Sequence, residues 1–296
     1  ATVADLCCGI GGNLTALAAG SRVVAVDRDL TSLKFARHNA AAAHAAHPVA
    51  LVCADVRQLT PGRPLAGAVF IDPARRSGDR RWPAGVCEPA LSWCLALPGW
   101  VPAVCVKAAP GLPRELIPPG WEAEFLAIGR HLKEVLLWSP ALATASRRAT
   151  ILPGGDTLLP DTLLPEPGPP VPVAAPGAYL LDPNPAVTRA GLVEDLARRL
   201  GAWKIDPMIA FLATDEPVRT PFARTLRVLE SMPWNEKRAA RRLRELGIGT
   251  ADIRRRGLAG DVDLIRRRLS LQGDGTAVIA LTRREDKPWG LICAPA

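Results

Sequence analysis

The first 110 residues alternate short apolar runs with helical stretches, and this alternation restricts the fold more than any other feature of the sequence. The expected strands are Thr2–Leu6, Arg22–Val26, Val49–Cys53, Gly67–Ile71 and Ala103–Lys107. The expected helices between them are Leu14–Ala19, Leu30–Ala46 and Glu88–Leu97. Strands separated by helices form parallel βαβ units, whose ligand sites lie at the carboxyl ends of the strands. The sequence therefore predicts an α/β domain built on a parallel sheet.

Residues 121–139 depart from this rhythm. Two apolar-rich runs, Glu122–Ile128 and Leu132–Trp138, are separated only by Gly129-Arg130-His131. Because no helix fits in three residues, we expect the two runs to pair as an antiparallel hairpin.

A proline-rich segment predicts where the first domain ends. Residues 153–176 contain eight prolines and three glycines in 24 positions, a composition typical of a linker or a long surface loop. We therefore predict one domain over residues 1–152, a linker over 153–176 and a second domain over 177–296. The second domain is expected to contain an amphipathic helix over Thr188–Leu200 and then a small α/β module with helices Asn235–Leu246 and Asp261–Leu269 and strands Arg227–Ser231, Ala251–Arg255, Ala277–Thr282 and Trp289–Cys293.

Several classes of protein are disfavoured by the composition. No apolar run approaches the roughly 20 residues of a membrane helix, and the first residues do not resemble a signal peptide, so we expect a soluble, cytoplasmic protein that contacts no membrane. The seven cysteines are odd in number and include no CxxC pair, which argues against a disulfide framework and against a zinc site. We expect no bound metal.

The glycine-rich sequence Asp5-Leu6-Cys7-Cys8-Gly9-Ile10-Gly11-Gly12-Asn13 follows the first expected strand. Glycines at such a turn let the backbone bend tightly and approach a ligand. Leu14 stands where the dinucleotide-binding pattern requires a third glycine, which disfavours a dehydrogenase. Asp5, just before the turn, suits a ligand with a cationic amino group, such as the methionine moiety of S-adenosylmethionine.

Four aspartates, Asp5, Asp27, Asp55 and Asp72, end four successive expected strands. In a parallel sheet these ends share one edge, and four carboxylates there suit a cationic sulfonium cofactor better than a dianionic dinucleotide. Asp27 is placed to accept hydrogen bonds from ribose hydroxyls, and Asp55 from an adenine amino group, while Val56 covers the ring. The alternative for each aspartate taken singly is a helix cap or a turn residue.

With these motifs, residues 1–140 resemble the class I S-adenosylmethionine methyltransferases, whose Rossmann-like sheet of seven strands ends in an antiparallel hairpin. The Asp-Leu-Cys-Cys-Gly-Ile-Gly-Gly and Asp-Pro-Ala-Arg-Arg sequences resemble the bacterial group with a C-terminal THUMP-like domain, and more distantly the trimethylguanosine synthases. The resemblance extends to residues 224–296 and implies that the substrate is a base in structured RNA, ribosomal or transfer. The group also carries a helical segment upstream of the first strand, which this sequence does not include.

The resemblance assigns roles to individual residues. It implies that S-adenosylmethionine is bound by Asp5, Cys7, Gly9, Gly11, Asn13, Asp27, Arg28, Asp55, Val56 and Asp72. It places Asp72, Pro73 and Arg75 in the catalytic position, where enzymes that methylate exocyclic amines carry an acid-Pro-Pro-aromatic motif. Ala74 and Arg75 depart from that motif, since they replace its second proline and its aromatic residue. A guanidinium can stack on a base or bind a phosphate; the alternative for Arg75 and Arg76 is an ion pair with a strand-end aspartate.

Positive charge is concentrated in residues 224–268, which carry 13 basic and 6 acidic side chains. Such a concentration indicates a phosphate-backbone partner. The expected RNA-binding residues are Arg76, Lys237, Arg241, Arg244, Arg254, Arg255 and Arg256, with Trp234 and Trp289 as the residues available for stacking. The alternative is an ordinary solvated surface in an arginine-rich protein, with 31 arginines and 6 lysines.

These features favour an S-adenosylmethionine-dependent methyltransferase that acts on RNA. Ala74 and Arg75 keep a second hypothesis open, namely an RNA-binding protein without catalytic activity on a degenerate methyltransferase fold.

Overall fold

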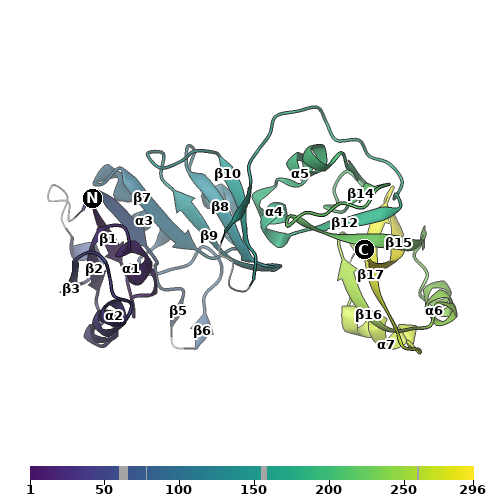
Figure 1. The fold of residues 1–296 in the computed structure, drawn as a ribbon, viewed down its shortest axis with the longest axis horizontal. Helices are drawn as coiled ribbons and strands as arrows, with labels where there is room; N and C mark the ends of the chain where they lie inside the picture. The colour runs from purple at the N-terminus through teal and green to yellow at the C-terminus, as the bar shows by residue number, and fades with distance from the viewer. Residues whose placement is uncertain (60–65, 78, 155–158, 259) are drawn as a thin grey trace. The chain divides into compact units, whose positions relative to one another are not determined.

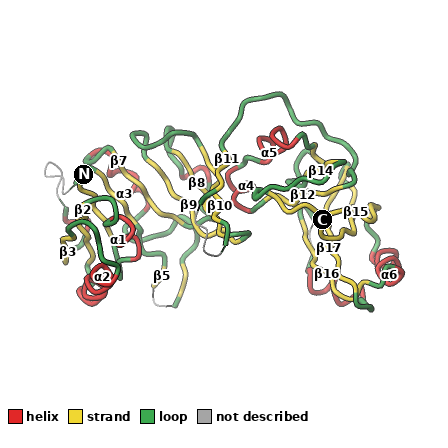
Figure 2. The backbone as a smooth tube through the Cα atoms, in the orientation of Figure 1, coloured by secondary structure: helices red, strands yellow, loops and turns green. Residues whose placement is uncertain are grey.

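The computed structural model describes residues 1–59, 66–77, 79–154, 159–258 and 260–296. The chain divides into two compact units, residues 1–150 and 151–296, which are coloured along the chain in Figure 1. Each unit is built around a β-sheet with helices packed against it (Figure 2).

Within the described residues the first sheet has nine strands in the order β11-β10-β8-β9-β7-β4-β1-β2-β3. Their bounds are β1 (Thr2–Leu6), β2 (Arg22–Asp27), β3 (Val49–Cys53), β4 (Ala68–Ile71), β7 (Ala103–Ala108), β8 (Glu122–Ile128), β9 (His131–Trp138), β10 (Arg147–Leu152) and β11 (Asp161–Leu163). A separate two-stranded sheet pairs β5 (Arg76–Ser77) with β6 (Arg80–Arg81).

The predicted parallel sheet and hairpin are both confirmed. β1 pairs in parallel with β2 and β4, β2 with β3, and β4 with β7, whereas β9 runs antiparallel to both β7 and β8. The seven strands from β8 to β3 form the expected methyltransferase sheet. β10 and β11 extend it beyond the hairpin, because β8 leaves its outer edge free for another strand.

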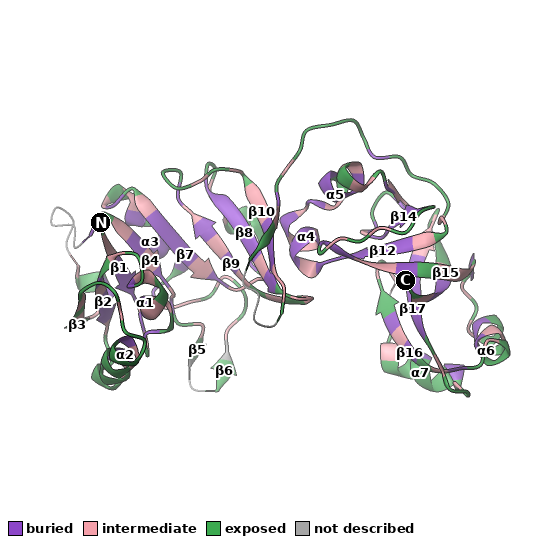
Figure 3. Cartoon of the chain, viewed as in Figure 1, coloured by how far each residue is buried: buried purple, intermediate pink, exposed green. Residues whose placement is uncertain are grey.

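The helices of the first unit are α1 (Gly12–Leu17), α2 (Leu30–Ala42) and α3 (Leu91–Ala96), with 3₁₀ turns η1 (Val56–Gln58), η2 (Leu97–Gly99) and η3 (Arg114–Leu116). Leu14, Leu33 and Ala36 of the first two helices pack on Val23 and Ala25 of β2, while the outer side of α2 is exposed (Figure 3). α2 begins at the Asp29 cap and is four residues shorter than predicted.

In the second unit the sheet has seven strands among the described residues, in the order β13-β14-β12-β15-β18-β17-β16. They are β12 (Tyr179–Pro183), β13 (Trp203–Lys204), β14 (Leu212–Thr214), β15 (Ala223–Pro233), β16 (Ile248–Arg255), β17 (Gly275–Arg284) and β18 (Lys287–Pro295). The helices are α4 (Pro185–Ala190), α5 (Val193–Leu200), α6 (Glu236–Glu245) and α7 (Val262–Leu269).

Both faces of this second sheet are covered. Alternate residues of β17 enter two different cores: Ile279 and Leu281 join a core with Leu243 of α6, whereas Val278 and Ala280 join a core on the other face. This follows from the two-residue period of a strand, which sends successive side chains to opposite faces. Because both faces of β17 are buried, successive residues of this strand have to be apolar, as they are from Ala277 to Leu281.

The prediction of a single helix over Thr188–Leu200 is wrong. Two helices, α4 and α5, occupy this region, and Gly191 between them adopts the left-handed conformation with φ of 69°. The break arises because glycine enters this conformation without the steric cost that other residues incur, which ends a helix.

The predicted linker is not devoid of structure where it is described. β11 lies within it, and Val173 forms a parallel bridge with Lys204; residues 155–158 lie outside the described residues. The predicted domain boundaries, at residues 152 and 177, remain predictions. No helix in the described part of the chain combines the length and apolarity that a membrane crossing requires.

Candidate functional site

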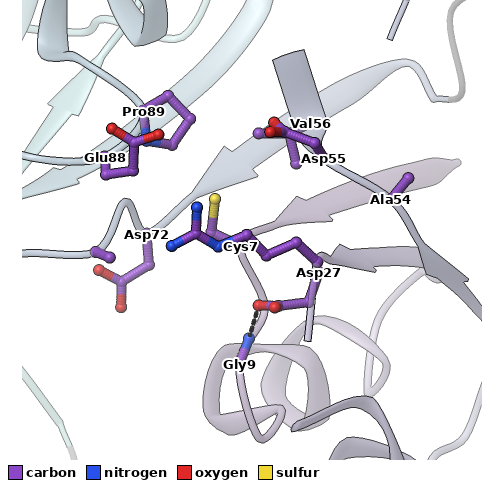
Figure 4. Close-up of a pocket in the computed structure, with 11 residues that line it drawn as sticks. Cys7, Gly9, Asp27, Ala54, Asp55, Val56, Asp72, Glu88 and Pro89 are labelled. Atoms are coloured by element: carbon purple, nitrogen blue, oxygen red, sulfur yellow. Dashed lines mark hydrogen bonds between the residues drawn. The ribbon is translucent and has the colours of Figure 1, made fainter. Parts of the chain in front are cut away.

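A cavity of about 230 Å³ opens at the carboxyl ends of β1 to β4. The sequence predicted seven of the residues that line it, namely Cys7, Gly9, Asp27, Arg28, Asp55, Val56 and Asp72. Ala54, Ala74, Glu88 and Pro89 complete the lining and were not predicted. In Figure 4, Asp27 and Asp72 lie on opposite sides of Cys7, and Asp55 faces Glu88 across the pocket.

The glycine-rich turn adopts the conformations that its sequence suggests. Gly9 and Gly11 have φ values of 54° and 87°, in the left-handed region that favours glycine. A Cβ atom on Gly11 would lie 3.1 Å from the Cα of Ala36, so this position also needs the absence of a side chain. Gly11 caps α1 and does not line the cavity, and neither does Asn13.

Asp27 joins the end of β2 to this turn. Its Oδ2 accepts a hydrogen bond of 2.8 Å from the backbone N–H of Gly9, and its Oδ1 accepts one of 2.9 Å from the N–H of Asp29. A carboxylate offers about four acceptor positions, so two remain for the vicinal hydroxyls of a ribose.

Asp5 is fully buried, and neither of its carboxyl oxygens has a hydrogen-bond partner among the described residues. Burial, and then the nearby charges of Asp72 and Asp27, raise the pKa of Asp5 to about 7, while Lys107 lowers it. Asp5 does not itself line the cavity. A buried carboxyl without a partner, beside two other carboxylates, fits a ligand that brings positive charge. S-adenosylmethionine brings a sulfonium and an ammonium group, so the residues present fit this cofactor.

Asp55 already has a partner. The guanidinium of Arg57 donates to both carboxylate oxygens of Asp55 and also lies 2.8 Å from Glu88. Hydrogen bonds from the Arg57 side chain and backbone lower the pKa of Asp55 to about 2. An adenine amino group at Asp55 would therefore compete with Arg57 for the same oxygens.

Asp72 follows β4, and Lys107 of β7 lies 3.1 Å from its Oδ2. The same ammonium lies 3.2 Å from Glu134 of β9. Although burial lowers the pKa of Lys107, the two carboxylates raise it above its usual value overall. Neither Lys107 nor Glu134 was predicted as a site residue. A charged residue at the end of the apolar strand Ala103–Lys107 was the available signal.

The chain after Asp72 is held in place by Glu88. Pro73 is buried, and the backbones of Ala74 and Glu88 exchange two hydrogen bonds of 2.8 and 2.9 Å. Arg75 is half-buried, and its Nη1 has no hydrogen-bond partner among the described residues. Within that part of the chain, Arg75 forms no ion pair with a strand-end aspartate, whereas exposed Arg76 lies in β5.

The predicted basic residues of the second unit fall into two groups. Lys237, Arg241 and Arg244 are exposed on α6, and a surface groove beside them is lined by Trp234, Lys237 and Arg241. Trp289 lies under Arg284, whose guanidinium carbon is 5.4 Å from the ring centroid.

Residues 254–256 are more constrained. Arg254 pairs with Asp252 at 2.9 Å, and Arg255 donates to the carbonyl of Gly260. Arg256 is half-buried, and it pairs with Asp182 at 2.8 Å while lying over the ring of Phe211. Arg256 therefore takes part in an ion pair within the second unit, a role that the sequence did not suggest.

Comparison with known proteins finds relatives of this chain among methyltransferases. The family described as RNA cap guanine-N2 methyltransferase matches residues 1–75, and the family described as THUMP domain-like matches residues 223–295. A protein of Mycobacterium tuberculosis described as an uncharacterized S-adenosylmethionine-dependent methyltransferase, found in two strains, is 38% identical over 290 residues, which cover 95% of this chain and 77% of that protein.

A solved structure has a similar fold. The crystal structure of a candidate methyltransferase from Porphyromonas gingivalis superimposes with a TM-score of 0.78 and 21% identity, over 100% of this chain and 77% of that one. The predicted α/β methyltransferase fold with a C-terminal THUMP-like region is thus confirmed.

Proposed function

Because the chain belongs to the S-adenosylmethionine-dependent methyltransferases, we propose that it transfers the methyl group of this cofactor to a base in structured RNA, ribosomal or transfer. The observation that carries the proposal is the position of Asp72 in the wall of the cavity, on the opposite side of Cys7 from Asp27 (Figure 4). An acceptor that reaches Asp72 would enter the same cavity that is proposed to hold the cofactor. The matches of residues 1–75 and 223–295 to RNA-related families support RNA as the acceptor.

The roles of the residues follow from their contacts. Asp27 would hold the ribose, Asp5 in its ionised form would face the cationic end of the cofactor, and the glycine-rich turn would let that end approach the backbone. When bound, S-adenosylmethionine supplies a methyl group on a positively charged sulfur, which leaves readily as a neutral thioether. The protein contributes alignment, because methyl transfer requires the acceptor nitrogen, the methyl carbon and the sulfur of the cofactor to lie in line.

Asp72 would align the acceptor. Its carboxylate can accept a hydrogen bond from the N–H₂ group of a base, which directs the nitrogen lone pair toward the methyl group. The half-buried guanidinium of Arg75, with Nη1 unpaired among the described residues, would contact the base plane or a phosphate. Reaching such a base requires it to be unpaired or flipped out of its helix.

The exposed side chains of α6 would hold the rest of the RNA. Lys237, Arg241 and Arg244 present positive charge to solvent, and Trp234 offers an aromatic face in the adjacent groove. These contacts suit recognition of the RNA backbone and shape rather than of base edges.

The test is transfer of tritiated methyl groups to total RNA from a strain that lacks the protein, followed by mass spectrometry of the nucleosides. We expect one methylated nucleoside, formed by the wild type and lost with Asp72→Ala but kept with the control Asp274→Asn, whose side chain is exposed. Calorimetry with S-adenosylmethionine is run in parallel. Cofactor binding without methyl transfer to any RNA would instead support a non-catalytic RNA-binding protein, the hypothesis that Ala74 and Arg75 motivate.

A further inference from the structure

Lys107 is a charged residue in an otherwise apolar strand, and none of the cofactor contacts proposed above uses it. β7 lies between β4 and β9 in the sheet, so the side chains that follow β4 and those of β9 flank its end. Asp72 follows β4, and Glu134 belongs to β9. The ammonium of Lys107 is 3.1 Å from Asp72 Oδ2 and 3.2 Å from Glu134 Oε2, so one cation bridges two carboxylates.

The bridge is partly buried. The side chain of Lys107 is 16% exposed, and those of Asp72 and Glu134 are 25% and 24% exposed. Partly buried ion pairs are screened by salt less than exposed pairs are. Hydrogen bonding to the ammonium engages Oδ2 of Asp72, while Oδ1 accepts no hydrogen bond from the described residues.

We propose that Lys107, supported by Glu134, is a positioning residue for methyl transfer, which holds Asp72 by one oxygen so that the other faces the acceptor nitrogen. This inference rests on the role of Asp72 in the proposed function. Lys107 acts through Asp72 and touches neither the cofactor nor the acceptor.

The charges around Asp72 give this arrangement a second consequence. Asp5 of β1, Asp27 of β2 and Glu134 of β9 bring negative charge toward the same edge, and the thiol of Cys7 also faces it. Like charges favour the protonated form of a carboxyl group, whereas a neighbouring ammonium favours the ionised form. Lys107 offsets these negative charges at Asp72, and its loss would leave the carboxylates to repel one another, so that Asp72 would no longer be held in one orientation.

The test compares Lys107→Met with Lys107→Arg and with the control Lys133→Met, which removes an exposed lysine of β9. Methyl transfer to RNA is measured from pH 5.5 to 9, with kcat and KM separated, and cofactor affinity is measured by calorimetry. For Lys107→Met we expect kcat to fall about 10- to 100-fold at pH 7 and the acid limb of its pH profile to move to higher pH. Lys107→Arg should restore most of both, and the KM for RNA should change little.

Two results would overturn the inference. One is a folded Lys107→Met protein whose acid limb does not move; the other is an equal loss at every pH that Lys107→Arg fails to rescue, which would mean a purely structural role. Glu134→Gln, which keeps the shape of the side chain, should produce a smaller shift in the same direction, and no shift would remove Glu134 from the proposal. If the wild type is active and either of the two contrary results is found, the inference about Lys107 is refuted and the proposed function stands. If the wild type transfers no methyl group, the proposed function is refuted as well.

Discussion

The backbone N–H of Gly9 donates a hydrogen bond of 2.8 Å to Oδ2 of Asp27, which ties the turn after β1 to the end of β2 at the edge of the cavity. Asp27→Asn keeps an acceptor oxygen for Gly9 but loses the charge, whereas Asp27→Ala loses both. Because hydrogen bonds to a charged group contribute about 1.5–3 kcal/mol each, we expect the affinity for S-adenosylhomocysteine to fall roughly 10-fold in the first variant and 100-fold in the second. Calorimetry measures this, with Asp274→Asn as the control. Equal affinity in all four proteins would exclude Asp27 from the site.

Ionised Asp5 should lower the stability of the folded protein. Its folded pKa of about 7 lies above the ordinary value of 3.8, so the unfolded chain releases this proton first and stability falls as the pH rises between the two values. Asp5→Asn carries no charge and should therefore be more stable than the wild type at pH 8, by on the order of 2 kcal/mol, but not at pH 4. Urea denaturation at both pH values tests this, and an unchanged difference between the proteins would contradict it.

The same carboxyl should make cofactor binding depend on pH. If ionised Asp5 receives the positive charge of S-adenosylmethionine, the affinity should rise about 10-fold from pH 6 to pH 8, since the pKa of Asp5 is about 7. The rise should vanish in Asp5→Asn, which should bind weakly throughout. A wild-type affinity that is flat over this range would mean that Asp5 does not meet the cofactor's charge.

Two adjacent glycines provide a matched pair for the turn. Gly11 has φ of 87°, and a Cβ atom there would lie 3.1 Å from the backbone of Ala36; Gly12 begins α1, and a Cβ atom there would meet nothing within 4 Å. Gly11→Ala should destabilise the protein by about 1–2 kcal/mol, and Gly12→Ala should be neutral or stabilise it by about 0.5 kcal/mol. Thermal unfolding distinguishes them, and similar behaviour of the two variants would show that the turn tolerates a side chain.

The basic residues of the second unit should separate into those that bind RNA and those that stabilise the fold. Removal of Lys237, Arg241 or Arg244 should weaken RNA binding and reduce the slope of log affinity against log salt by about 0.7–0.9 for each phosphate that is no longer neutralised. Arg256→Ala should leave this slope unchanged but destabilise the protein by about 2 kcal/mol, because it removes the ion pair between Arg256 and the buried carboxylate of Asp182. An Arg256→Ala protein that is fully stable yet binds RNA poorly would reverse this assignment.

Local patterns in the sequence accounted for the architecture well. The strands of the parallel sheet were predicted to within a residue or two, because an apolar run between polar turns is a local signal. Helix ends were harder to predict. α2 stops at Ala42 although the alanine-rich segment, interrupted by His44, continues to Ala46. Gly191 divides a region whose amphipathic pattern predicted one helix.

The gathering of strand-end aspartates at one edge of a parallel sheet could be predicted without the structure, since it depends on strand direction and on the position of each residue along its strand. The ion-pair partners of these and other charged residues could not be predicted in this way. Lys107 bridges Asp72 and Glu134, Arg57 joins Asp55 to Glu88, and Arg256 pairs with Asp182, 74 positions away in the chain. The physical reason is that periodicity reports which side of an element a side chain occupies, whereas an ion pair depends on which distant element the packed sheet brings within about 4 Å.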